Sequence, residues 1–190
     1  RLGRELFGDN STGYYIRDSL MALNAIELLK DPKNKIIIWA HNAHIIYNAN
    51  KLEFGENVKI TGKNLGQHLL EHFPNSSMNI GFTSFAGTSL GFEVSQIDEI
   101  PSYKLICDYS VPKYNYITSG DNSLEKYLST KDSKYFLINT KCINEKSLIF
   151  KPFKYVECKG DLSISYDALF FIKEMVNSEE YFKRFSSINN

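Results

Sequence analysis

The pattern of apolar and polar positions at the start of the chain predicts a buried helix that leads into a buried strand. Residues 14–30 carry apolar side chains around most of a helical circumference, after polar starters at 10–12 and before a stop at Asp31 and Pro32. A helix that is apolar nearly all round is buried. The run 35–40, with sequence KIIIWA, is continuous and rich in β-branched residues, which is typical of a strand covered on both faces.

The rest of the chain alternates between helical and strand patterns. Residues 63–73 are predicted to form a helix with Leu65, Leu69 and Phe73 as its inward stripe, and residues 78–85 alternate as a strand. Weaker patterns predict strands at 103–108, 135–138 and 168–172, a short helix near 123–130 and a charged terminal helix from Ser178. A buried helix leading into a strand is the unit of α/β folds. We therefore expect an α/β fold with a mixed, mostly parallel central sheet flanked by helices.

Two histidines follow the predicted strand at its carboxyl end, where ligands of α/β sheets bind. They are His41 and His44, with Asn42 between them. An imidazole gains and loses a proton near neutral pH, which suits acid–base catalysis. The amide of Asn42 can orient an imidazole or donate to a developing oxyanion. Capping or core histidines are the alternative, but the strand-end position favours a catalytic role for His41 and His44.

Polar residues within the first predicted helix indicate a polar site inside the fold. Arg17 and Asn24 are seven residues apart and share a stripe, while Asp18 points to another side. Buried polar groups need partners. A buried guanidinium holds a carboxylate or a catalytic group by bidentate bonds, and a purely structural ion pair between Arg17 and Asp18 is an equally good interpretation.

A metal site is a weaker interpretation of the remaining histidines. Residues 68–72 spell His-x-x-Glu-His, the inverted zinc-protease motif, and a helix would place both histidines on one side. Such a site needs another carboxylate ligand, and Glu71 lies opposite the apolar stripe of its helix, so we expect it to face solvent. No third ligand is evident near His41 and His44 either. We predict no metal and no cofactor, and keep zinc proteolysis as a third hypothesis.

Composition narrows the classes of partner. Lys and Arg number 22, as do Asp and Glu, so the neutral chain offers no electrostatic reason to bind nucleic acid or an anionic membrane. No apolar run approaches the roughly 20 residues that span a bilayer. We expect buried thiols rather than disulfides or zinc ligands at Cys107, Cys142 and Cys158. We expect loop packing, rather than a pocket wall, from Tyr103, Tyr109, Tyr114 and Tyr116.

Two closely spaced motifs resemble the erythromycin esterase family, which includes relatives labelled as succinoglycan biosynthesis proteins. They are Arg17-Asp18-x-x-Met21-Ala22-x-Asn24 and Trp39-Ala40-His41-Asn42-Ala43-His44. Weaker agreement comes from residues 62–70, from 79–87 and from 166–171, so that the resemblance spans residues 14–172.

The resemblance implies helices around a central sheet and water-mediated hydrolysis of a macrolide lactone, without a covalent serine intermediate or a required metal. It places His41 and His44 in the active-site cleft, and Arg17 and Asp18 at its wall. Binding or bracing residues are then Arg17, Asp18, Asn24 and Asn42. The expected partner is a small-molecule ester; macrolide resistance is one possible role, and a cytoplasmic location is favoured.

The family's general base and its glutamate partner precede the helix that carries Arg17. Residues 1–13 contain no histidine, and their only acids are Glu5 and Asp9. Arg1 is not a methionine, and we expect residues 1–190 to form a single domain that is the C-terminal part of a hydrolase and inactive alone. The alternative is a catalytically incomplete domain that binds a ligand or a partner.

Overall fold

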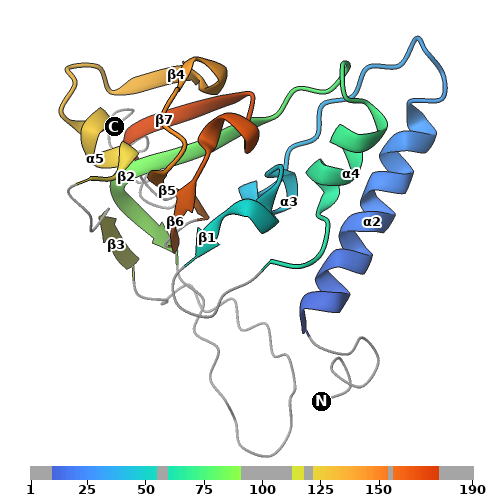
Figure 1. Cartoon of the computed structure of the whole chain (residues 1–190), viewed down its shortest axis with the longest axis horizontal. Helices are drawn as coiled ribbons and strands as arrows, with labels where there is room; N and C mark the ends of the chain where they lie inside the picture. The colour runs from blue at the N-terminus through green and yellow to red at the C-terminus, as the bar shows by residue number, and fades with distance from the viewer. Residues whose placement is uncertain (1–9, 55–59, 91–112, 118–121, 154–155, 176–190) are drawn as a thin grey trace, which may run out of the picture.

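The computed structural model describes residues 10–54, 60–90, 113–117, 122–153 and 156–175. Figure 1 shows two helices, α2 and α4, side by side at one end of the molecule and the strands at the other. The helices are α2 (Asn10–Leu28), α3 (Asn42–Ile45), α4 (Leu65–His72) and α5 (Leu124–Ser129). The strands are β1 (Glu53–Phe54), β2 (Ile80–Leu90), β3 (Lys113–Ile117), β4 (Tyr135–Asn139), β5 (Leu148–Phe153), β6 (Val156–Gly160) and β7 (Ala168–Met175).

The strands form two sheets. The larger sheet has the order β3-β2-β7-β4, in which β2 and β7 are parallel and the two outer pairings are antiparallel. The smaller sheet, β1-β6-β5, is antiparallel throughout. The predicted mixed α/β fold is confirmed, but "mostly parallel" is wrong for the described strands. β5 and β6 follow each other along the chain with Phe153 paired to Val156, and so short a connection joins only antiparallel neighbours.

The core lies against one face of the larger sheet. Alternation along β7 turns Leu169 and Phe171 inward, where they are 1% and 0% exposed. The smaller sheet and the chain before β7 supply Phe150, Leu162 and Tyr166, which are also buried and belong to the same cluster. Each of these residues removes apolar surface from water, which is the main favourable term in folding.

Most predicted elements are present. The helices at 14–30, 63–73 and 123–130 and the strands at 78–85, 135–138 and 168–172 correspond to α2, α4, α5, β2, β4 and β7. Side chains cap two of these helices, because Asn64 accepts from the amide of Gln67 and Ser123 accepts from that of Lys126. The strand at 103–108 and the helix from Ser178 lie outside the described residues, and sequence patterns missed β1, β3, β5 and β6.

Two burial predictions are wrong. Residues 35–40 are not a strand, and the side chains of Ile37 and Trp39 are 96% and 85% exposed. α2 is covered on one side only, since Leu20 and Leu23 are 56% and 60% exposed. Both predictions fail for the same reason. A strand needs a hydrogen-bonding neighbour, and a helix that is apolar all round needs neighbours on every side; the described residues supply neither for these two segments.

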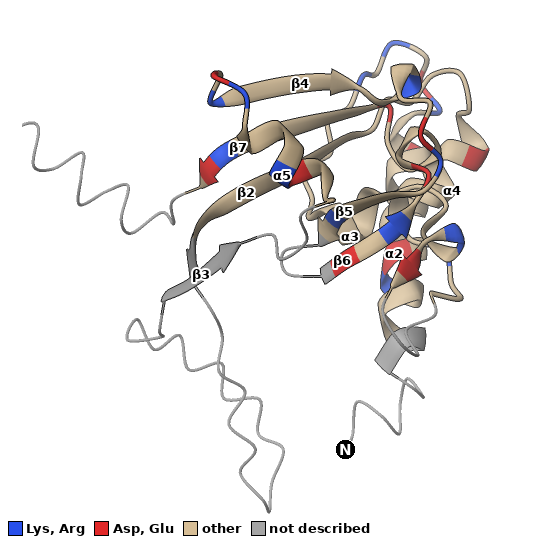
Figure 2. Cartoon of the chain, turned by 60° about the vertical axis from the view of Figure 1, so that its left-hand side comes forward, with Lys and Arg blue, Asp and Glu red and all other residues tan. Residues whose placement is uncertain are grey.

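The remaining surface agrees with a neutral chain. Basic and acidic residues alternate over the elements drawn in Figure 2, without a patch of one sign. Cys158 is buried as predicted, whereas Cys142 is exposed and Cys107 lies outside the described residues. Among the helices that the structure describes, none is long and apolar enough to cross a membrane.

Candidate functional site

A buried carboxylate and an imidazole from separate helices form the centre of the candidate site. Nδ1 of His44, in α3, lies 2.8 and 3.0 Å from the two carboxylate oxygens of Asp18, in α2. Asp18 is 0% exposed, and its Oδ2 also accepts from the backbone amide of Leu65 at 3.1 Å. That amide is the first of α4, where the helix dipole favours a negative charge. The carboxylate of Asp18, in α2, is therefore held by α3 and α4 at once.

The neighbours of His44 determine which ring nitrogen carries the proton. A terminal nitrogen of Arg17 lies 3.0 Å from Nε2. A guanidinium only donates and a carboxylate only accepts. Nδ1 of a neutral ring is therefore protonated and donates to Asp18, while Nε2 presents its lone pair to Arg17. Arg17 itself is not the buried guanidinium that the sequence predicted, because 60% of its side chain is exposed; the buried polar group is Asp18.

Tyr14 packs flat on the imidazole. The centroids of the Tyr14 and His44 rings are 4.9 Å apart and their planes differ by 15°. The guanidinium of Arg17 lies over the Tyr14 ring, 5.4 Å from its centroid. The Tyr14 hydroxyl is buried and has no hydrogen-bond partner among the residues that the structure describes. Burial, and then the nearby Asp18 carboxylate, raise the pKa of Tyr14 well above its usual value. Sequence analysis missed Tyr14, although its spacing of three from Arg17 places both on one helical face.

Short-range contacts fix the position of α3. The Asn42 side chain donates to the carbonyl of Phe82 and accepts from its amide, at 2.6 and 3.1 Å, and so attaches α3 to β2. Asn64 donates to the carbonyls of Ala43 and Ile46. Gly66 allows α4 to approach closely, because a Cβ there would collide with the backbone of Ile45. The amide of Asn42 is thus engaged with the sheet and braces the site.

The other predicted site residues lie apart from this centre. His41 is the N-cap of α3, and its Nδ1 accepts from the amide of Ala43 at 3.2 Å. Asn24 is exposed, two helical turns from Arg17. The structure therefore brings together Arg17, Asp18 and His44, gives Asn42 a bracing position and leaves Asn24 outside. The catalytic roles of both histidines stay predictions.

The His-x-x-Glu-His segment is engaged in local contacts. Nε2 of His68 lies 3.0 Å from the hydroxyl of Ser19 and joins α4 to α2. Glu71 faces outward, as predicted, and pairs with Lys63 at 2.8 Å, while the ring of His72 packs edge-on against Phe73. Over the described part of the chain, no three His, Cys, Asp or Glu side chains are grouped to hold a metal ion.

A cavity of about 320 Å³ adjoins the site on its Tyr14 and Ala43 side. Its lining also includes amide and charged side chains, among them those of Asn48, Gln67 and Lys63. The cavity is lined by both polar and apolar side chains, and His44 is not part of its lining.

Comparison with known proteins decides the family. The sequence profile of the family described as erythromycin esterase matches residues 5–175, nearly the whole chain. The chain belongs to the erythromycin esterase family. Both motifs of this family member, including Asp18 and His44, lie inside the matched range.

Individual relatives are longer than this esterase-family chain. The Bacillus subtilis (strain 168) protein named "Putative hydrolase YbfO" is 32% identical over 80 residues, which cover 40% of this chain and 18% of that protein. A histidine-to-asparagine mutant of the erythromycin esterase EreC, in its open conformation, superposes with a TM-score of 0.62 at 22% identity and covers 84% of this chain and 37% of its own.

Two further solved structures share the fold. A succinoglycan biosynthesis protein superposes with a TM-score of 0.65 at 18% identity, over 89% of this chain and 40% of that one. A Bacillus cereus protein gives 0.64 at 17% identity, over 87% and 40%. The chain thus spans well under half the length of the solved structures that it matches.

Proposed function

We propose that this chain carries the histidine centre of a carboxylic-ester hydrolase. The observation that supports it best is the arrangement of Asp18, His44 and Arg17: a buried carboxylate on Nδ1, a lone pair on Nε2 and a cation beside that lone pair. A carboxylate that fixes the tautomer of a histidine and stabilises its protonated form is the usual support for proton transfer. Family membership and a relative named as a hydrolase agree with this class of reaction.

The chemistry follows from these three side chains. Once the exposed guanidinium of Arg17 turns to the ester carbonyl oxygen, Nε2 of His44 is free to take a proton from water. The water oxygen bonds to the carbonyl carbon, Arg17 stabilises the resulting oxyanion, and Asp18 stabilises the imidazolium. The C–O bond to the alcohol then breaks, Nε2 returns its proton to the leaving alkoxide, and a carboxylic acid and an alcohol depart.

This reaction is proposed for the whole protein, of which the chain is one part. Because the matched structures have more than half of their length outside the superposed part, we take the chain to be the C-terminal portion of a larger hydrolase domain. In the alternative that the family resemblance implies, the base that deprotonates water comes from the preceding portion, and His41 or His44 stabilises the oxyanion or protonates the leaving alcohol. A macrolide lactone is the first substrate to test, without a metal requirement, and the 190 residues alone are expected to be inactive.

The decisive experiment replaces His44 in the whole protein, including the polypeptide that precedes Arg1. His44→Asn keeps a hydrogen bond to Asp18 possible but removes the proton carrier, so hydrolysis of erythromycin and of a p-nitrophenyl ester should fall about 100-fold or more. Glu27→Gln, exposed on α2, the helix that carries Asp18, is the control and should keep full turnover. Equal turnover of His44→Asn and wild type would overturn the proposal.

A binding module is the second candidate function. The observation that favours it is the position of Arg17. Its guanidinium lies 3.0 Å from Nε2 of His44 and so blocks access to that atom, while 60% of the Arg17 side chain is exposed to solvent. Calorimetric titration of the whole protein with a non-hydrolysable ester analogue separates the two functions. Tight binding without any turnover of the matching ester supports the module, and turnover excludes it.

A further inference from the structure

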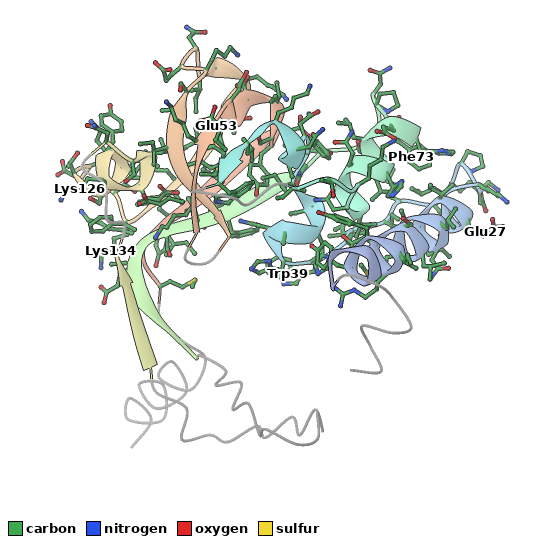
Figure 3. All side chains as sticks on the ribbon, turned by 60° about the horizontal axis from the view of Figure 1, so that its bottom comes forward. Glu27, Trp39, Glu53, Phe73, Lys126 and Lys134 are labelled. Atoms are coloured by element: carbon green, nitrogen blue, oxygen red, sulfur yellow. The ribbon has the colours of Figure 1, made fainter. Side chains whose placement is uncertain are left out.

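The helix that carries His44 is too short to hold its own shape. α3 has four residues, and isolated helices shorter than roughly 12–15 residues are marginal in water. Its carbonyls need partners from other elements, and those partners fix its position. Figure 3 shows the chain entering α3 at Trp39, beside α2. The direction of the His44 side chain is therefore set by the elements around α3.

Asn64 connects α3 to α4. Its Nδ2 donates to the carbonyl of Ala43 at 2.9 Å and to that of Ile46 at 2.8 Å, so that one amide group binds the backbone on both sides of His44. Its Oδ1 accepts from the amide of Gln67 at 2.9 Å and caps α4. Asn64 is 5% exposed, so water has little access to replace these bonds.

The same residue also orients the donor that holds Asp18. Asn64 is followed directly by Leu65, whose backbone amide donates to Oδ2 of Asp18 at 3.1 Å. Capping fixes the first turn of a helix, and with it the direction of its first amides. Asn64 therefore acts on both partners of the histidine centre, on α3 with His44 and on the amide that binds the Asp18 carboxylate.

Other contacts of α3 lack this double connection. Asn42 joins α3 to β2 at Phe82, and Asn79 donates to the carbonyl of Ile45 at 2.6 Å. Among the described residues, neither asparagine side chain hydrogen-bonds to α2 or α4. They attach α3 to the larger sheet, whereas Asn64 alone of these three also caps the helix whose first amide holds the buried carboxylate.

We propose that Asn64 is a positioning residue for the hydrolysis: it keeps Nδ1 of His44 against Asp18 and so keeps the lone pair on Nε2. Asn64 does not touch the reacting atoms. When α3 is free to shift relative to α4, the imidazole loses its fixed acceptor and samples the tautomer with the proton on Nε2. In that tautomer Nε2 cannot take a proton from water. This inference rests on the proposed function of His44.

Asn64→Ser tests the positioning role without any measure of turnover. Serine also caps helices, but its shorter side chain has one donor proton and cannot bind both carbonyls. Proton–nitrogen correlation spectra of the whole protein with labelled histidine, under basic conditions that keep imidazoles neutral, report which ring nitrogen is protonated. His44→Asn identifies the signals of His44.

The wild type should show His44 with its proton on Nδ1, and Asn64→Ser should show a clear share of the tautomer with the proton on Nε2. A spectrum of folded Asn64→Ser equal to that of the wild type overturns the proposal. A wild-type spectrum with the proton on Nε2 overturns it as well, because there would then be no arrangement for Asn64 to maintain.

Steady-state kinetics of the whole protein gives a second readout. For Asn64→Ser, kcat should fall about 10-fold or more with little change in KM, because the proton acceptor is misplaced while Arg17 stays. Ser123→Ala, which removes the side-chain cap of α5, is the control for the loss of a helix contact and should change neither the tautomer nor kcat. An equal fall of kcat in Ser123→Ala would mean that lost stability causes the effect, and it overturns the proposal.

Gly66→Ala alters the same helix contact and leaves Asn64 in place. A Cβ at residue 66 would collide with the carbonyl oxygen of Ile45, so the substitution pushes α3 away from α4. The tautomer of His44 should change in the same direction as in Asn64→Ser, and a folded Gly66→Ala protein with the wild-type tautomer overturns the proposal. Full turnover by His44→Asn would instead reject the proposed function alone, since the tautomer spectra still decide whether Asn64 positions His44.

Discussion

Asp18 places both carboxylate oxygens within 3.0 Å of Nδ1 of His44 and has no exposure to solvent. The two residues are 26 positions apart and sit on different helices, so the contact depends on how α2, α3 and α4 pack. A buried carboxylate that loses its partner is costly, which makes this pair important for the structure as well as for the proposed reaction.

Removing the charge of Asp18 should therefore impair proton transfer at His44. In Asp18→Asn the side-chain oxygen still accepts from Leu65, but the amide no longer stabilises an imidazolium and favours the other tautomer. We expect kcat of the whole protein to fall roughly 100-fold or more with a smaller change in KM. Steady-state hydrolysis measures both constants, and Glu27→Gln is the control on the same helix.

Unchanged kcat in a folded Asp18→Asn protein would show that His44 works without its carboxylate. A circular dichroism spectrum equal to that of the wild type is needed with this measurement, since an unfolded variant would lose activity for another reason.

His41 allows capping to be separated from catalysis. Its ring accepts from the amide of Ala43 at the start of α3, a task that asparagine performs well. His41→Asn should keep stability and His41→Ala should lose about 0.5–2 kcal/mol, as measured by urea unfolding. If capping is the main role, His41→Asn also keeps the rate of hydrolysis.

A large loss of kcat in His41→Asn at unchanged stability would instead assign His41 to the chemistry, as the sequence motif suggests. The comparison is sharp because the two substitutions differ in capping and share the loss of the imidazole.

Local sequence patterns predicted the helices and strands that depend mainly on residues close together in the sequence. The stripe of Leu65, Leu69 and Phe73 predicted α4, and alternation predicted β2. The segment 35–40 shows the limit: its sequence favours a strand, yet strand formation depends on a partner that no described residue supplies.

The candidate site could likewise be predicted only in part from the sequence. The motif spacing singled out Arg17, Asp18 and His44, but helical periodicity alone placed Arg17 on the inner side. One residue is a step of about 100° around a helix, so the packing of α4 against α2 decided that Asp18 is buried and Arg17 exposed. The stack of Tyr14 on His44 joins two helices, and no local pattern reports it.

Tyr14 should support His44 through its ring and not through its hydroxyl. Tyr14→Phe keeps the stacked ring and removes a buried hydroxyl that no described residue hydrogen-bonds, so we expect equal or slightly higher stability and nearly full hydrolysis. Tyr14→Ala removes the ring, frees His44 to move and should lower kcat several-fold more than Tyr14→Phe does. Thermal unfolding and steady-state kinetics on both variants test this, and a Tyr14→Phe variant as slow as Tyr14→Ala would assign a chemical role to the hydroxyl.

Glu125 should make the stability of the chain depend on pH. It is 0% exposed, and burial raises the pKa of its carboxyl above the ordinary 4.5, although Oε1 accepts from the amide of Lys151 at 2.9 Å and from the hydroxyl of Thr83 at 2.7 Å. The folded protein therefore holds a proton that the unfolded chain releases near its lower pKa. The stability that this proton confers is present below the unfolded pKa and is lost as the pH rises through the folded one.

Glu125→Gln is neutral at every pH, and its amide oxygen accepts the same two hydrogen bonds. The difference in the free energy of unfolding between wild type and Glu125→Gln should shift against the wild type as pH is raised from about 4 upward. Burial lowers the pKa of Lys151 and the Glu125 carboxylate raises it, so Glu125→Gln also changes Lys151, and a Lys151→Met background separates the two contributions. Urea unfolding across this pH range measures the difference, and parallel curves would mean that the Glu125 carboxyl ionises in the fold as easily as in the unfolded chain.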